Sequence, residues 1–179
     1  MSKNFWHDIE TGGDVPEIIN VIVEIPKGSM NKYEYDKKHN MIKLDRVLFS
    51  PFHYPGDYGL IPQTLSEDGD PLDALVLVTN PTYPGILIES RPIGLLEMKD
   101  DGEPDDKIIC VSTNDPRYLH TSDIENIEDH YRSEIAHFFQ VYKELEGKKV
   151  EIIGWKDAKD AKKVVIESIK RYKETLKKY

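Results

Sequence analysis

The sequence predicts an α+β fold in which a small closed sheet of short strands comes first and two helices come last. Two observations predict it. Before Asp129 the apolar runs are short and bounded by Gly or Pro, whereas after Asp129 apolar residues recur every three or four positions. Because many short strands must bury their edges, a compact closed sheet flanked by the two helices of the C-terminal half is expected.

The first third of the chain predicts a strand, a hairpin and a loop. Ile18–Ile25 is rich in Ile and Val and ends at Pro26-Lys27-Gly28, which is typical of a strand closed by a turn. Lys32–Asp36 and Met41–Arg46 alternate in character around a polar turn, so they predict a hairpin. Phe49–Leu60 mixes prolines and glycines with aromatic residues, which favours a structured loop rather than a regular element.

Three further apolar runs predict buried strands in the middle of the chain. They are Leu72–Val78, Ile86–Met98 and Lys107–Val111, each bounded by Gly or Pro. The one cysteine, Cys110, falls inside the last run and is interpreted as a small core residue. A single cysteine forms no internal disulfide, which is compatible with a reducing compartment.

The last third predicts two helices around one strand. Apolar residues spaced by three and four run from Asp129 to Leu145, and Gly147 is a typical residue just past a helix end. Val150–Trp155 predicts a strand, and Ala158–Lys178 places its apolar residues on one helical face. With 179 residues, 39% of them hydrophobic, the chain fits one domain, residues 1–179.

Charge and segment composition exclude several function classes. The net charge of −9 opposes a broad phosphate-backbone footprint, so nucleic-acid binding is not expected, while divalent cations are attracted. There is no apolar run of about 18 residues that would span a membrane, and the N-terminus lacks the apolar region of a secretory signal. We therefore expect a cytoplasmic protein that binds no membrane.

Two dense acidic clusters are the most informative local feature. Asp68, Asp70 and Asp73 stand in the run Asp-Gly-Asp-Pro-Leu-Asp. Two like charges about 4 Å apart repel by roughly 4 kcal/mol at an effective dielectric constant of about 20, so such a group is either well solvated or bound to a cation. The second cluster comprises Asp100, Asp101, Glu103, Asp105 and Asp106. Because both clusters lie beside predicted strands, we expect them to form one site.

The donor types indicate which metal this site would take. Carboxylates supply only oxygen, and no His-Glu-x-x-His pair is present, which favours a hard ion such as Mg²⁺ over zinc. An EF-hand loop starting at Asp68 fails because Leu72 and Asp73 stand where Asp or Asn and then Gly are required. Magnesium held by few carboxylates usually shares its coordination sphere with phosphate, so a phosphate substrate is expected.

Several cationic and phenolic residues suit a phosphate ligand, although each has a plainer interpretation by itself. Lys32 and Arg46 lie on the predicted hairpin, where Glu34 shares the face of Lys32. Taken singly, these are ordinary surface strand residues. Further donors are Lys107, Tyr142 and Lys143, of which Tyr142 also fits a helix core. The sequence contains no P-loop, which excludes nucleotide cleavage by that device.

The motifs taken together resemble the soluble family I inorganic pyrophosphatases. Asp68-Gly69-Asp70-Pro71-Leu72-Asp73-Ala74 matches the family's Asp-x-Asp-Pro-hydrophobic-Asp signature. Other family motifs follow in the same order and at similar spacing between about Val15 and Trp155: Glu24-Ile25-Pro26, Lys32-Tyr33-Glu34, Asp45-Arg46, Tyr54-Pro55-Gly56-Asp57-Tyr58-Gly59, Arg91-Pro92-Ile93-Gly94, Asp105-Asp106-Lys107, and His137-Phe138-Phe139 with Tyr142-Lys143. Because these motifs occur together and in order, the resemblance is highly specific to this family. It outweighs the interpretation of the same residues as ordinary surface or core positions.

The resemblance implies a fold, an activity and an assembly. The fold would be a compact β-barrel of OB-like form flanked by helices, in a cytoplasmic enzyme that assembles as a homohexamer in prokaryotic members. The chain looks like the short prokaryotic subunit. The activity would be Mg²⁺-dependent hydrolysis of inorganic pyrophosphate to two orthophosphates by metal-activated water, without a covalent intermediate and with several ions in each active site.

The resemblance also implies a role for individual residues. Asp68, Asp73 and Asp105 would hold a tight metal pair, Asp100 with Asp105 a metal arriving with substrate, and Glu34 a further ion. The phosphates would be bound by Lys32, Arg46, Tyr58, Lys107, Tyr142 and Lys143. Asp70 would orient and deprotonate the attacking water, with Glu24 and Tyr54 supporting these groups from behind. Asp101 stands where some members carry Glu, so it is kept out of the metal set.

Two rival functions stay open at this point. The first is a non-catalytic OB-like module that binds single strands by stacking bases on Phe49, Phe52, Tyr54 and Tyr58. The second is a calcium buffer, which would take up Ca²⁺ without hydrolysis. The net charge of −9 speaks against the first.

Overall fold

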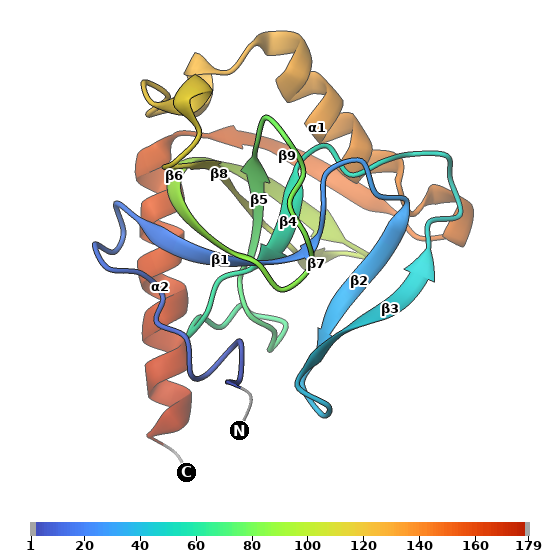
Figure 1. The fold of residues 1–179 in the computed structure, drawn as a ribbon. Helices are drawn as coiled ribbons and strands as arrows, with labels where there is room; N and C mark the ends of the chain where they lie inside the picture. Colours follow the sequence, from blue (N-terminus) through green and yellow to red (C-terminus); the bar gives the residue numbers. More distant parts are fainter. Residues whose placement is uncertain (1–2, 178–179) are drawn as a thin grey trace.

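Five strands pair into a ring in the computed structural model, which describes residues 3–177 (Figure 1). The pairing order is β1–β4–β5–β8–β6, and β6 pairs back with β1. The strands and helices are β1 Ile19–Ile25, β2 Asn31–Asp36, β3 Met41–Val47, β4 Asp57–Leu60, β5 Asp73–Leu77, β6 Leu87–Asp100, β7 Glu103–Pro104, β8 Lys107–Ser112, α1 Asp129–Val141, β9 Val150–Lys156 and α2 Ala158–Leu176. The α+β class is as predicted, with the strands joined in a ring.

The central strands are buried on both faces, which explains their unbroken apolar runs. In β5, Leu75 and Leu77 belong to a core cluster shared with α1, whereas Ala74 and Val76 belong to a second cluster shared with α2. Successive side chains of a strand point to opposite faces, so a strand between two cores has no polar side. Cys110 on β8 is fully buried in the second cluster, as predicted for a core residue.

The two helices cover the ring through their apolar faces and begin at side-chain caps. α1 buries Ile135, Phe138 and Phe139, and α2 buries a stripe that includes Val165 and Tyr172. The Glu128 carboxylate accepts hydrogen bonds from two backbone N–H groups at the start of α1, and Asp157 does the same for one at the start of α2. Such caps satisfy donors that have no partner within the helix.

The prediction that Phe49–Leu60 is loop throughout was wrong at its end, because Asp57–Leu60 forms β4. The prediction failed because Gly59 was interpreted as a loop residue, whereas β4 requires a glycine at this position. A Cβ atom on Gly59 would lie 1.9 Å from the carbonyl oxygen of Ile22 on β1, so only glycine lets the two backbones pair this closely. A residue typical of loops therefore stands inside a paired strand.

The end of α1 also differs from the prediction. α1 stops at Val141 rather than Leu145, and a separate 3₁₀ turn, Glu144–Glu146, follows before Gly147. Gly147 has φ +74, so it is the left-handed cap of that turn rather than of the helix. α2 ends at Leu176, and the predicted last residue, Lys178, lies outside the described residues.

The remaining differences are short elements that carry no periodic signal. β6 runs to Asp100, two residues beyond the predicted end, and turns into the two-residue strand β7. Two further 3₁₀ turns, Pro116–Tyr118 and Ile124–Asn126, connect β8 to α1. Such pieces are too short for hydrophobic periodicity to indicate.

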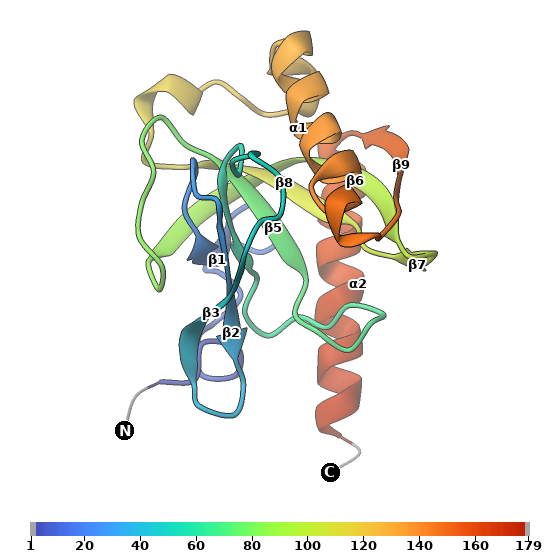
Figure 2. The same ribbon diagram turned by 90° about the vertical axis from the view of Figure 1, so that its right-hand side faces the viewer.

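The predicted hairpin is present and forms a two-stranded sheet of its own. β2 and β3 pair antiparallel and project from the strand ring on the side away from α2, as Figures 1 and 2 both show. The hairpin therefore makes a wall beside the ring rather than a part of it. Within residues 3–177, no helix has the length and apolar character needed to cross a membrane.

Candidate active site

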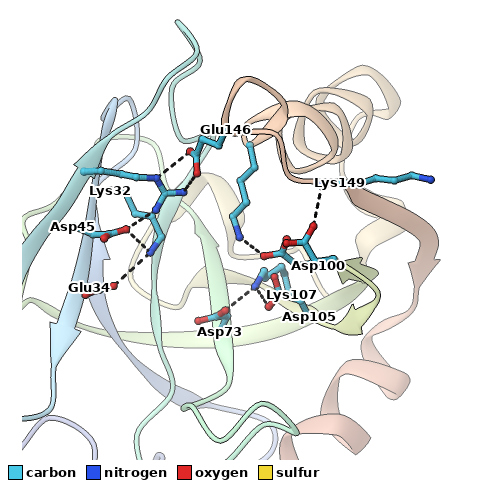
Figure 3. Close-up of polar contacts among 12 residues, drawn as sticks. Lys32, Glu34, Asp45, Asp73, Asp100, Asp105, Lys107, Glu146 and Lys149 are labelled. Atoms are coloured by element: carbon cyan, nitrogen blue, oxygen red, sulfur yellow. Dashed lines mark hydrogen bonds and ion pairs between the residues drawn. The ribbon is translucent and has the colours of Figure 1, made fainter.

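The two acidic clusters meet on one cavity of about 700 Å³. From the first cluster it is lined by Asp68, Asp70 and Asp73, and from the second by Asp100, Glu103 and Asp105. The hairpin, which carries Lys32 and Glu34, forms one wall (Figure 3). The segment after α1 contributes Tyr142 and Lys143. Carboxylates that are separated in the sequence thus surround one solvent-filled space.

Strand pairing explains this convergence. β5 and β8 are parallel neighbours, with Ala74 opposite Ile108, so Asp73 and Lys107 stand side by side where the two strands begin. The signature run leads into β5, and the second acidic cluster leads into β8. Parallel register therefore brings the two clusters together at the same end of the sheet.

Lys107 is the buried centre of the site. Its side chain is 2% exposed, and its Nζ donates to Asp73 Oδ2 at 2.6 Å and to Asp105 Oδ1 at 2.5 Å (Figure 3). Burial alone would lower the pKa of this ammonium, but the two carboxylates more than offset burial and raise its pKa. Lys107 is therefore a fixed positive charge on the cavity floor.

Tyr58 lies beside this charge. The Lys107 ammonium is 5.6 Å from the centre of the Tyr58 ring. Burial, and then the charges of Asp73 and Asp105, raise the pKa of the phenol well above its ordinary value. Tyr58 therefore stays a neutral hydroxyl that can donate a hydrogen bond into the cavity, which it lines.

The second acidic cluster divides into residues that line the cavity and residues that build the turn. Asp100 Oδ2 pairs with the Lys143 ammonium, and its buried Oδ1 has no hydrogen-bond partner among the described residues. Asp101 is not among the lining residues. Its backbone N–H donates to Lys149 O at 2.9 Å, and its Oδ1 accepts from Lys149 N at 3.2 Å. Asp106 likewise turns away and accepts from Met98 N.

The first acidic cluster sits in a tight turn at the rim. Asp70 N donates to Asp68 Oδ1 at 2.9 Å, and Gly69 has φ +88, a conformation that favours glycine. The Asp70 carboxylate is exposed and pairs with the ammonium of Lys37, a hairpin residue that sequence reasoning did not single out.

The hairpin wall carries a chain of alternating charges. Lys32 Nζ lies 3.7 Å from Glu34 Oε2 and 3.2 Å from Asp45 Oδ2. A register shift after Lys32 leaves Lys32 opposite Arg46, so both cations share one end of the hairpin. Lys32 and Glu34 line the cavity as their shared face predicts, whereas Arg46 is not among the lining residues.

Arg46 is held by two carboxylates, Asp45 from its own motif and Glu146, which the sequence did not indicate. Glu146 accepts from its Nε at 3.0 Å and lies 2.7 Å from its Nη2, while Asp45 Oδ2 lies 2.5 Å from Nη1. Glu146 is 100 positions away in the sequence, in the turn after α1. No local pattern around Glu146 indicates this contact, because it depends on how the hairpin and that turn lie in space.

The two residues predicted to support the site, Glu24 and Tyr54, differ in whether they reach the cavity. Glu24 lines the cavity from β1 and is nearly buried, with Tyr35 N donating to its Oε1 at 2.6 Å. Burial, and then Asp73, raise the pKa of Glu24 to about 8, so its carboxyl holds a proton near neutral pH. Tyr54 is buried behind the cavity, where it packs against Tyr58 and Phe138.

The segment after α1 supplies the last two predicted phosphate ligands. Tyr142 and Lys143 are both nearly buried and both line the cavity. The Tyr142 ring stacks on Phe138, and burial raises the pKa of its phenol. The helix-core interpretation of Tyr142 is therefore confirmed for its ring, whereas its position on the cavity is compatible with the predicted phosphate contact, which stays a prediction.

The donor set fits a divalent metal, although no ready-made cage is present. Among residues 3–177, no three His, Cys, Asp or Glu side chains come close enough together to hold one ion, since the carboxylates turn toward lysines instead. The carboxylates on the cavity nevertheless offer only oxygen, and Asp100 Oδ1 is a buried acceptor without a partner. Oxygen donors of this kind suit a hard divalent cation.

The aromatic residues of the rival nucleic-acid hypothesis do not form a stacking surface. Phe49 is 62% exposed, but Tyr54 is 2% exposed and packed within the core. Base stacking needs several exposed rings along one groove. Of the four aromatic residues, Phe49 alone is exposed, while Phe52 and Tyr58 are half-buried and Tyr54 is buried, so they do not form such a row of rings.

Comparison with known proteins gives consistent matches. A family model described as inorganic pyrophosphatase matches residues 21–173. An inorganic pyrophosphatase of Halobacterium salinarum is 52% identical over 163 residues, covering 90% of this chain and 92% of that protein. One from Synechocystis is 53% identical, covering 87% of this chain and 92% of that protein. The crystal structure of inorganic pyrophosphatase from Thermus thermophilus has a TM-score of 0.92 and 47% identity, covering 96% and 99% of the two chains.

Proposed function

The chain belongs to the inorganic pyrophosphatase family, and from that premise we propose how its own residues carry out the reaction. It is a short prokaryotic-type family I enzyme that hydrolyses inorganic pyrophosphate to two phosphates. One observation carries the proposal: two distant acidic clusters and several lysines surround a single cavity. The carboxylates can bind a divalent metal, and the lysines can bind an anionic substrate beside it.

We propose that the metal is Mg²⁺ and that several ions bind in each site. Asp68, Asp73, Asp105, Asp100 and Glu34 would hold them, since all five line the cavity and supply oxygen. When bound, the metal supplies Lewis-acid chemistry, neutralising phosphate charge and making water easier to deprotonate. The lysine contacts of Asp73, Asp105 and Asp100 keep these carboxylates near the cavity, where the same oxygens are available to a cation.

The cations of the chain bind the substrate in this proposal. Lys107 and Lys143 present positive charge from the floor and the far wall, and Lys32 does so from the hairpin. Arg46 would contribute from the end of the hairpin that it shares with Lys32, where Asp45 and Glu146 fix its guanidinium. The hydroxyls of Tyr58 and Tyr142 donate hydrogen bonds, because burial keeps both phenols neutral. Together these groups stabilise charge that develops on the departing phosphate.

Asp70 is the proposed proton acceptor. A water oxygen attacks one phosphorus atom, its proton passes to the Asp70 carboxylate, and the bond from that phosphorus to the bridging oxygen breaks. The exposed Asp70 carboxylate on the cavity rim is accessible to solvent water, as this role requires. No covalent intermediate is needed, and the one cysteine is buried in the core. Glu24 and Tyr54 support the site from below.

Three broader features accompany the proposal. The ring order, with β5 and β8 parallel, supports a closed barrel of OB-like form. By family resemblance the chain would assemble as a homohexamer, which light scattering on the purified protein would test. The same resemblance supports a cytoplasmic location, with no nucleic-acid or membrane partner.

A phosphate-release assay tests the function directly. The purified protein should release phosphate from pyrophosphate with Mg²⁺, lose this activity with EDTA, and be much slower on ATP. Asp73→Asn should lower turnover by orders of magnitude while the circular dichroism spectrum stays unchanged. Full turnover in this variant would reject the metal assignment, and Ca²⁺ uptake without any hydrolysis would favour the buffer.

A further inference from the structure

Lys37 joins three segments of the chain at the cavity rim. It lies in the turn between β2 and β3, where its ammonium pairs with Asp70 Oδ1 and lies 3.4 Å from Gly69 O. The same nitrogen is 4.5 Å from the centre of the Trp6 ring. One ammonium thus touches a carboxylate, a carbonyl and an aromatic face that come from the signature loop and the N-terminal segment.

Trp6, over whose ring this ammonium lies, is itself held in place by hydrogen bonds. Its indole Nε1 donates to Thr64 O at 2.8 Å, and its backbone carbonyl accepts from Gln63 N at 2.8 Å. The ring is therefore tied to the segment that leads into the signature loop. The face of an aromatic ring attracts a cation, which favours one position of the Lys37 side chain.

The signature loop fixes the backbone of Asp70 but not its carboxylate. Ser66 N donates to Asp70 O at 2.7 Å, and Asp70 N donates to Asp68 Oδ1. Within residues 3–177, Lys37 is the one side chain that hydrogen-bonds the Asp70 carboxylate. The orientation of this carboxylate therefore depends on the hairpin.

We propose that Lys37 is a positioning residue for Asp70 in pyrophosphate hydrolysis. By holding Oδ1, the ammonium leaves Oδ2 of a carboxylate that lines the cavity free to accept the proton of the attacking water. The proposal rests on the assignment of Asp70 as proton acceptor. Misplacing a reacting group by about 1 Å can cost up to about 100-fold in rate, so the loss of this contact should lower kcat.

Lys38 offers a matched control in the same turn. It also lines the cavity and carries the same charge, but among the described residues it makes no ion pair with a carboxylate. If the two lysines act only by attracting the anionic substrate with their positive charge, Lys37→Met and Lys38→Met should raise KM by similar factors. If Lys37 acts through Asp70, only Lys37→Met should lower kcat.

The experiment is a double-mutant cycle read by phosphate release at saturating Mg²⁺. Lys37→Met should lower kcat about tenfold with KM changed no more than in Lys38→Met, and Lys37→Arg should restore most of kcat. In an Asp70→Asn background, adding Lys37→Met should lower kcat no further. Both side chains of the pair are well exposed, so the fold should tolerate each change.

The outcomes separate this proposal from the assignment of Asp70 itself. Equal kcat in Lys37→Met and Lys38→Met would overturn the positioning role, as would the same tenfold loss in the Asp70→Asn background. Failure of Lys37→Arg to restore kcat would also contradict it, because arginine can make the same contact. If Asp70→Asn alone keeps full turnover, the role of Asp70 fails instead, and the proposal falls with it.

Discussion

Lysine–aspartate ion pairs occur both on the floor and at the rim of the cavity. On the floor they are buried, and at the rim the pair is exposed to solvent. On the floor, Lys107 is 2% exposed between Asp73 and Asp105. At the rim, Lys37 is 45% exposed and its partner Asp70 is 62% exposed. Exposed pairs contribute about 0–1 kcal/mol to stability, whereas breaking a buried pair costs about 3–5 kcal/mol. A substitution on the floor should therefore change both stability and activity, whereas a substitution at the rim should change activity with little effect on stability.

The largest test of this contrast removes the charge on the floor. Lys107→Met should lower the free energy of unfolding by about 3 kcal/mol, because it leaves two partly buried carboxylates without their counterion. Urea unfolding of the metal-free protein would measure this loss, and phosphate release should fall by orders of magnitude. Lys37→Met at the rim is the control and should unfold as the unmodified protein does. A floor variant as stable as the rim variant would break the comparison.

The pH dependence of stability should also differ between floor and rim. The pKa of Glu24 on the floor is raised to about 8 by burial and then by Asp73. A raised folded-state pKa gives stability that is full below the unfolded value of about 4.5 and is lost as pH rises through about 8. In EDTA, the Glu24 contribution should fall by about 1.4 kcal/mol per pH unit at most across this window.

Glu24→Gln should abolish this loss of stability at rising pH. Asp36, at the end of β2, should show the opposite dependence, because its pKa is lowered rather than raised. Hydrogen bonds from the side chain and then the backbone of His39 lower the pKa of Asp36 to about 2. Its contribution is therefore present above its unfolded value and lost only as pH falls through about 2. Unfolding midpoints from pH 2 to 9 for Glu24→Gln and for Asp36→Asn would test these two opposite dependences. If stability changes with pH between 5 and 8 by the same slope in Glu24→Gln and in the unmodified protein, the raised pKa of Glu24 is contradicted.

The smallest expected effect concerns Asp101, beside the cavity. It has φ +50, and its carboxylate and backbone both bond to Lys149. Asp and Asn tolerate this left-handed conformation better than Glu, so Asp101→Glu should lower stability by about 1 kcal/mol and Asp101→Asn should not. Thermal unfolding with parallel activity assays would measure both. A metal ligand would show the reverse order, with activity kept by Glu and lost with Asn.

The comparison of floor and rim also explains which parts were predictable. Sequence patterns predicted nearly every strand of the ring and both helices, because side-chain period and turn residues are local properties. They failed at β4, where Gly59 looked like a loop residue but allows close approach of β1. They also failed at the end of α1, where Tyr142 and Lys143 leave the helix to face the cavity.

The sequence by itself determined the chemical content of the site: two acidic clusters, the cations that face them, and an ordered set of motifs that identifies the family. Only the tertiary structure decided which charges meet. The parallel register of β5 and β8 seats Lys107 between Asp73 and Asp105, and the packing of the hairpin sets Arg46 against Glu146. These pairings depend on strand register and burial, which set distance and dielectric, and neither is a property of neighbouring residues in the chain.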